Sequence, residues 1–204
     1  MKRFLALLGL AAVLASPAGA QPVQQTGVTF GYIAKPTYSA AFIGLVPAAS
    51  TTDMICLAGS ATKTVKLTSL KLSGSGTAIS VPVTLLKRVT ADTGGTAAST
   101  TANPANTISK RDSGNATATA VPIAYTANPT IVDTSPTYID SAQMGVVATT
   151  VGLIGAPIIF DYTVDGAQLR QAPTLKGVAE QICVNLNATS ATALLTGTMT
   201  WTEE

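Results

Sequence analysis

The two cysteines of this 204-residue chain, Cys56 and Cys183, are the first side chains to consider for chemistry. The chain contains no His, so neither thiol has the imidazole that usually activates a catalytic cysteine, and a Ser-His-Asp triad is excluded. An even number of cysteines in an exported chain favours a disulfide, which here would close a loop of about 127 residues. Two separate buried thiols, acting as small hydrophobic side chains, are the alternative. The pair is therefore a candidate disulfide rather than a catalytic site.

Five carboxylates could take part in acid–base catalysis: Asp133, Asp140, Asp161, Asp165 and Glu180. The four aspartates among them could also bind calcium. A glycoside hydrolase that works without His would need two of them as a pair. The sequence has no calcium loop of the D-x-D-x-D-G kind, and none of the five lies in an aromatic-rich stretch. We therefore predict a non-enzymatic protein with no metal site and no cofactor.

Residues 1–20 have the features of a secretory signal peptide. A short basic start precedes an apolar run over 4–14, and the small residues Ala18 and Ala20 lie just before Gln21. The run is too short to cross a bilayer, which takes about 20 residues. We expect cleavage between Ala20 and Gln21, followed by export to the periplasm, the cell surface or the medium without membrane attachment. An uncleaved membrane anchor is the alternative.

The composition argues against a nucleic-acid-binding protein. Charged residues make up 11% of the chain, well below the usual value of about 25%, and Thr alone supplies 32 residues. Loss of Lys2 and Arg3 with the signal peptide would leave 10 basic against 10 acidic residues. No excess of positive charge would then remain to neutralise phosphates. The pairs Lys87-Arg88 and Lys110-Arg111 are expected on the solvated surface.

Alternation of apolar and smaller or polar residues predicts β-strands along most of the chain. The clearest runs are 81–89, 121–125, 158–164 and 195–202, and further strands are expected at 28–34, 41–45, 54–58, 146–154 and 178–186. In 63–73 the inward phase changes by one residue, which predicts a β-bulge near Ser69. Trp201 shares its parity with other apolar residues, so we expect it in the core rather than stacked on a sugar. We predict no helix of ten residues or more beyond the signal peptide.

Several short strands separated by turn signals predict one all-β domain. We expect a jelly-roll-like antiparallel β-sandwich over 28–204, preceded by a flexible arm at 21–27. Residues 91–118 are small and polar, and they predict a long mobile surface loop.

Five segments, at 52–65, 83–95, 124–130, 177–186 and 201–204, resemble a family of small uncharacterised β-proteins encoded by tailed phages, prophages and phage-rich metagenomes. They include VTLLKRVTADTGG, YTANPT and the terminal WTEE. The resemblance covers most of 52–204 and implies a jelly-roll-type sandwich in a virion-associated structural or accessory protein. It brings no catalytic residues with it. The signal peptide and the cysteine pair depart from the family pattern, and they favour a secreted or surface role.

Two hypotheses for function follow. The first is a structural or assembly subunit of a phage particle or of a surface assembly. If the protein is encoded by a phage, we expect it in the virion. We predict a homo-oligomer, with a trimer as its expected state. The second is an exported module that binds a glycan or cell-surface ligand through loops such as 91–118.

Overall fold

The computed structural model of the protein describes residues 35–46, 52–77, 79–97, 108–148, 155–163, 171–187 and 193–204. Residues 35–204 form one compact unit. The expected signal peptide at 1–20 with its Ala20-Gln21 cleavage site, the arm at 21–27 and the strand at 28–34 lie outside the described residues. Within the described ranges, no helix is long and apolar enough to cross a membrane.

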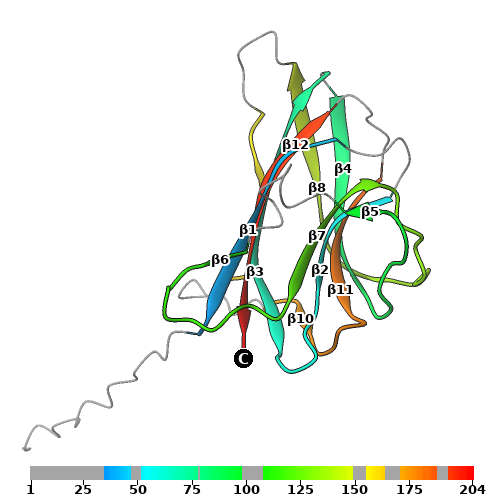
Figure 1. The fold of residues 1–204 in the computed structure, drawn as a ribbon. Helices are drawn as coiled ribbons and strands as arrows, with labels where there is room; N and C mark the ends of the chain where they lie inside the picture. Colours follow the sequence, from blue (N-terminus) through cyan, green and yellow to red (C-terminus); the bar gives the residue numbers. More distant parts are fainter. Residues whose placement is uncertain are drawn as a thin grey trace, which may run out of the picture. The chain divides into compact units, whose positions relative to one another are not determined.

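The described residues form twelve β-strands and no helix, which confirms the predicted all-β class (Figure 1). The strands are β1 (Thr37–Leu45), β2 (Thr52–Ala58), β3 (Val65–Gly76), β4 (Ile79–Arg88), β5 (Thr96–Ala97), β6 (Ile108–Lys110), β7 (Val121–Ala127), β8 (Thr137–Ala148), β9 (Ile158–Asp161), β10 (Thr174–Leu175), β11 (Gln181–Leu186) and β12 (Leu194–Glu203).

The strands are hydrogen-bonded in the order β5-β7-β2-β11-β4-β8-β3-β12-β1-β6, and β9 and β10 pair with β3 beside this path. The sheet is mixed, so the expectation of purely antiparallel strands was wrong. β3 and β8 pair in parallel, with Gly74 opposite Val146. The reason is topological. The chain reverses between β3 and β4, and β8 lies between them antiparallel to β4, so β8 must run parallel to β3.

Strands that lie far apart in the sheet share one hydrophobic core. Buried residues of β2, β4 and β11 belong to the same cluster as those of β1, β3 and β12. The largest is Trp201, which is fully buried as predicted and stacks on Tyr38 with ring centroids 6.0 Å apart. The Tyr38 hydroxyl donates a hydrogen bond to the Ala116 carbonyl at 3.0 Å, which ties β1 to the segment leading into β7.

The predicted bulge is present. In the pairing of β12 with β3, Thr200 lies opposite Ser69 and Trp201 lies opposite Leu67, so Thr68 is the extra residue. The bulge restores the inward phase, because Leu67 and Leu70 are both buried although they are an odd number of residues apart.

Three predicted segments differ from the structure. The strand expected at 146–154 begins earlier, as β8 starts at Thr137, and residues 149–154 lie outside the described part of the chain. The stretch 91–118 contains β5 and β6, the latter paired with β1, while residues 98–107 lie outside the described part of the chain. β11 begins at Gln181 rather than Val178, because a turn precedes it in which Glu180 N–H donates to the Gly177 carbonyl at 3.1 Å.

Candidate functional site

Cys56 and Cys183 form a disulfide, which confirms the predicted pairing. The two residues lie directly opposite each other in the antiparallel pairing of β2 with β11, with Cα atoms 4.1 Å apart. Both are fully buried, beside Leu86 and Tyr125 in a small apolar cluster separate from the main core. A disulfide is compatible with an oxidising, exported location.

A bulge in β2 places a carboxylate beside this disulfide. Asn185 pairs with Asp53 and Val184 pairs with Ile55, so Met54 has no partner in β11. Residues three apart in a regular strand point to opposite faces. The extra residue therefore brings Asp53 to the same face as Cys56, where its Oδ1 accepts a hydrogen bond from Asn185 Nδ2 at 2.6 Å.

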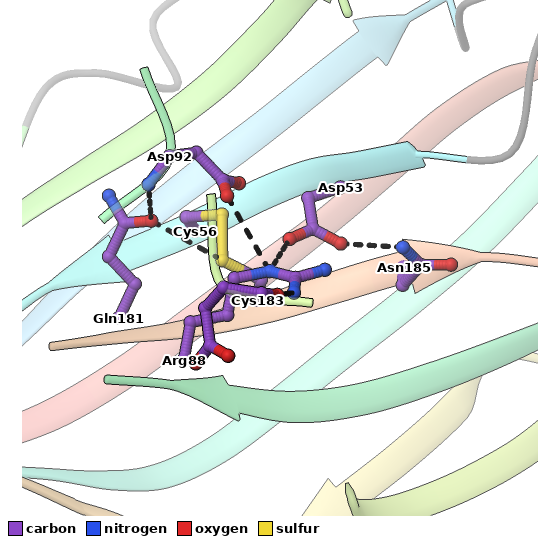
Figure 2. The surroundings of a disulfide bond; sticks show 8 residues. Asp53, Cys56, Arg88, Asp92, Gln181, Cys183 and Asn185 are labelled. Atoms are coloured by element: carbon purple, nitrogen blue, oxygen red, sulfur yellow. Dashed lines mark hydrogen bonds and ion pairs between the residues drawn. A yellow bond between two sulfur atoms is a disulfide. The ribbon is translucent and has the colours of Figure 1, made fainter. Parts of the chain in front are cut away.

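Arg88 lies at the centre of this site rather than on the surface, so the expectation for its half of the Lys87-Arg88 pair was wrong. Its side chain is 3% exposed, and its Nε bonds to the Asp53 carboxylate. Its Nη1 donates to the Asp133 main-chain carbonyl. Burial lowers the pKa of Arg88, but the hydrogen bond and charge of Asp53 outweigh burial and raise it. Figure 2 shows the guanidinium between two carboxylates and next to the disulfide.

The second carboxylate belongs to Asp92, whose side chain is fully buried. Its Oδ1 lies 3.6 Å from Arg88 Nε, and within the described part of the chain neither of its oxygens has a hydrogen-bond donor. Its main-chain N–H donates to Gln181 Oε1 at 3.0 Å. Burial, and then the nearby negative charge of Asp53, raise the pKa of Asp92 to about 7 despite the opposing effect of Arg88.

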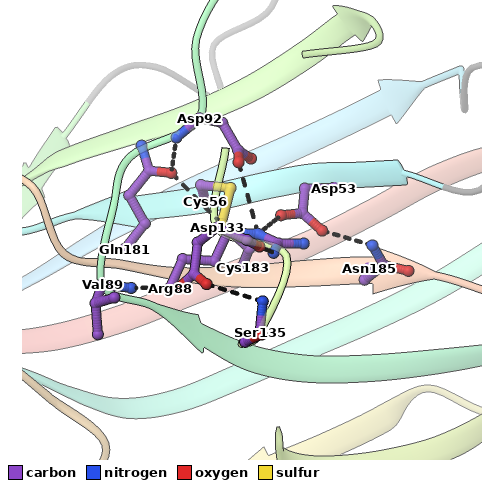
Figure 3. Close-up of polar contacts among 10 residues, drawn as sticks. All are labelled: Asp53, Cys56, Arg88, Val89, Asp92, Asp133, Ser135, Gln181, Cys183 and Asn185. Carbon is purple, nitrogen blue, oxygen red and sulfur yellow. Dashed lines mark hydrogen bonds and ion pairs between the residues drawn. A yellow bond between two sulfur atoms is a disulfide. The ribbon is translucent and has the colours of Figure 1, made fainter. Parts of the chain in front are cut away.

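Residues 89–95, which we call the cover segment, hold Asp92 over the disulfide. The segment is anchored to the chain after β7, because Thr93 and Thr130 exchange main-chain hydrogen bonds of 3.0 and 2.7 Å. At its start the Val89 N–H donates to Asp133 Oδ2 at 2.8 Å (Figure 3). Gly95 has a φ of 72°, and a Cβ there would lie 2.9 Å from Pro129 Cα, so the turn needs glycine.

The carboxylates and sulfurs of this site are spaced like metal ligands, but their chemical state does not suit metal binding. One potential ligand atom each from Asp53, Cys56, Asp92 and Cys183 lies within 4.8 Å of the others. The two sulfurs are bonded to each other, whereas metal ligation by cysteine requires thiolates. Arg88 already supplies positive charge to the carboxylates. We call this arrangement, in which the ion pairs of Arg88 with Asp53 and Asp92 lie beside the Cys56–Cys183 disulfide, the covalent and ionic lock.

Among the described residues, the carboxylates identified from the sequence do not gather into one site, and each accepts a hydrogen bond from a main-chain N–H group. Asp161 accepts hydrogen bonds from the Thr163 main chain and hydroxyl, which lower its pKa. Asp133 accepts from the Val89 and Ser135 N–H groups, and its pKa is lowered as well.

Glu180 and Asp140 also have partners of their own. Glu180 forms an ion pair with Lys87 at 3.0 Å and accepts from the Lys176 N–H. Burial raises its pKa, but these contacts outweigh burial and lower it. Asp140 accepts from the Ser141 N–H at 2.9 Å, and Asp165 lies outside the described residues.

Glu203 is a third buried carboxylate, after Asp53 and Asp92, and none of the three was among the candidates named from the sequence. It accepts hydrogen bonds from the main-chain N–H groups of Thr119 and Ala120, the Thr119 hydroxyl and the Trp201 indole, at 2.6–3.1 Å. Burial raises the pKa of Glu203, but these donors outweigh burial and lower it. Glu203 thereby ties β12 to the segment before β7.

A shallow surface depression of about 530 Å³ lies between β4 and β8, and Tyr138 and Asp140 line part of it. Tyr138 is 72% exposed, the largest exposed fraction among the large hydrophobic side chains described. Thr84 and Ser141 place hydroxyl groups beside it. An exposed ring next to polar groups can bind a ligand that has both apolar and hydroxyl surfaces.

No protein-family model, curated protein or solved structure matches the chain.

Proposed function

We propose that this chain is an exported, non-enzymatic structural or assembly protein with a jelly-roll-like β-sandwich fold. The observation that carries the proposal is the joint covalent and ionic lock, in which the Cys56–Cys183 disulfide lies under Arg88 and its carboxylates. A fully buried disulfide stabilises a protein that must persist outside the reducing cytoplasm. The arrangement fits a durable scaffold rather than a reaction centre.

Three further features support this proposal. The signal-peptide-like sequence at 1–20 accounts for export, and the resemblance to phage-encoded β-proteins favours a role in a virion or surface assembly. The outer side of β12 carries Thr196, Thr198 and Thr200, a neutral face suited to contact with other subunits. We propose a homo-oligomer, with a trimer as the expected state.

Intact-mass analysis of the natively expressed protein, with its compartment recorded, tests export. We expect a chain beginning at Gln21 and two hydrogens lighter than its reduced form. A full-length, reduced protein in the cytoplasm would contradict the proposal. Size-exclusion chromatography with light scattering tests assembly, and a strict monomer at high concentration would contradict the oligomer.

A second candidate function, a secreted glycan- or cell-surface-binding module, is favoured by the exposed ring of Tyr138 in the depression between β4 and β8. Binding on a glycan array that is lost in Tyr138→Ala would support it. The matched control is Ile159→Ala, which removes a side chain that is 59% exposed on β9. Equal loss in both variants, or no binding by the wild type, would contradict this function.

A further inference from the structure

We infer that Asp92 is a pH-dependent latch: its neutral carboxyl group holds the cover segment closed over the Cys56–Cys183 disulfide, and its ionisation opens the segment and exposes the disulfide to reductants. This inference concerns the regulation of the disulfide and does not depend on whether the protein acts in assembly or in ligand binding.

Several acidic residues compete for one cation, Arg88, and this competition disfavours the ionised form of Asp92. Asp53, Asp92 and Asp133 converge on one guanidinium, but Arg88 makes its hydrogen bonds to the Asp53 carboxylate and the Asp133 main-chain carbonyl. Asp92 makes the longer 3.6 Å ion pair, and no donor among the described residues reaches its two oxygens when both carboxylates are ionised. Asp92 and Asp53 can share a hydrogen bond only when one of them keeps its proton. An ionised carboxylate that is buried without hydrogen bonds is strongly disfavoured, whereas the neutral acid is tolerated.

The groups facing Asp92 come from every element packed around it. They are Asp53 and Cys56 on β2, Arg88 at the end of β4, Tyr125 on β7, Asp133 after β7, and Gln181 and Cys183 on β11. Arg88 is the one cation among them, and it faces the two other carboxylates as well as Asp92. The raised pKa of Asp92, about 7, agrees with this arrangement and places its ionisation near neutral pH.

Opening is expected to be local. The cover segment is short and contains two glycines with positive φ, at Gly94 and Gly95. Its described main-chain ties are the Thr93–Thr130 bridge and the hydrogen bonds at Val89 and Asp92. The strands below it are held by continuous pairing of β2, β11 and β4. The segment can therefore lift while the sheet stays intact.

The rate of disulfide reduction tests the latch. A water-soluble phosphine reduces the disulfide to two thiols, and the phosphine becomes its oxide with oxygen taken from water. Wild type and Asp92→Asn are compared between pH 5.5 and 8.5, because the amide mimics the neutral acid and the ratio of rates cancels the reductant's own pH dependence. We expect the ratio of wild type to variant to rise about tenfold or more across this range. A constant ratio would overturn the proposal.

Hydrogen exchange of the wild type supplies a test that does not need the variant to fold. After correction for intrinsic exchange rates, amides of residues 89–95 should lose protection as the pH rises toward 7 and then level off, while those of β3 and β12 should keep theirs. Protection of 89–95 that is unchanged with pH would overturn the latch. Simultaneous loss in all three regions would also overturn it, because the opening would then be global. None of these outcomes bears on export or oligomeric state.

Discussion

Two regions of this protein each bury a carboxylate, and the two have opposite electrostatics. Glu203, at the end of β12, accepts hydrogen bonds from main-chain, hydroxyl and indole donors, and its pKa is lowered. Asp92, above the disulfide, has within the described residues no hydrogen-bond donor, and its pKa is raised to about 7. Both side chains are buried deeply, so burial alone does not decide the charge of a group.

The difference assigns different tasks to the two regions. The Glu203 region joins β12 to the segment before β7 with an anion that is fully satisfied at neutral pH. In the region around Asp92, one guanidinium faces several carboxylates. The repulsion between these carboxylates is smallest when Asp92 keeps its proton. The Glu203 contacts are therefore expected to hold at neutral pH, whereas the contacts around Asp92 are expected to depend on pH.

Arg88→Met should produce the largest loss of stability, about 3–5 kcal/mol in the free energy of unfolding at pH 7. The change leaves the fully buried Asp53 carboxylate without its cation. Urea denaturation measures the effect. The matched control is Lys87→Met, the neighbouring cation in β4, whose partly exposed pair with Glu180 should contribute no more than about 1 kcal/mol. Equal losses in the two variants would show that Arg88 is not a buried anchor.

Removal of the disulfide by Cys56→Ala with Cys183→Ala should lower the free energy of unfolding by about 2–4 kcal/mol, because the bond closes a long loop in the unfolded chain. The bond spans 127 residues. Denaturation of the oxidised wild type and the double variant is the measurement. A change below about 0.5 kcal/mol would show that the cross-link does not limit the unfolded state.

Glu203→Gln should lower the free energy of unfolding at pH 7 by about 1–3 kcal/mol, because the amide presents an NH₂ group to donors that need an acceptor. Asp92→Asn should have no such cost at pH 7, since the amide resembles the neutral acid. Thermal denaturation of the two variants side by side compares the regions directly. Destabilisation of both to the same extent would remove the distinction between them.

The pH dependence of stability should have opposite signs at the two sites. Asp92 is bound to its proton more tightly in the folded state, so its contribution falls as the pH rises from about 4 to 7 and then levels off. Glu203 has a lowered folded pKa, so its contribution is present above its unfolded pKa and is lost as the pH falls through the folded value. Relative to Asp92→Asn, the wild type should lose at most about 1.4 kcal/mol per pH unit over the first range. A flat difference would contradict the raised pKa.

The sequence was most informative where strands have one buried face. Alternation along β12 placed Trp201 and Met199 inside and the threonines outside. The structure has Thr196, Thr198 and Thr200 on the outer side, but Thr202 is buried. The phase change in β3 located the bulge to within one residue, at Thr68. Glu203 shares the parity of Trp201, and this signal could have identified it as an inward-facing carboxylate.

The region around Arg88 could not be predicted in the same way. β2 and β11 are buried on both faces, because the cover segment packs over the side that an open sheet would leave to solvent. Whether a loop covers a strand is a tertiary property with no period in the sequence, so Arg88 was assigned to the surface. Asp53 was hidden further by the bulge at Met54, which changes its face.

The most direct test of this account is a carbon-13 NMR titration of the side-chain carboxyl groups in the oxidised protein, with Asp92 and Glu203 assigned by substitution. We predict that Asp92 titrates near pH 7 and that Glu203 titrates below the ordinary value for Glu of about 4.3. An Asp92 that titrates at or below about 4 would mean that Arg88 fully compensates its charge. In that case the two regions would be alike, and the latch over the disulfide would not exist.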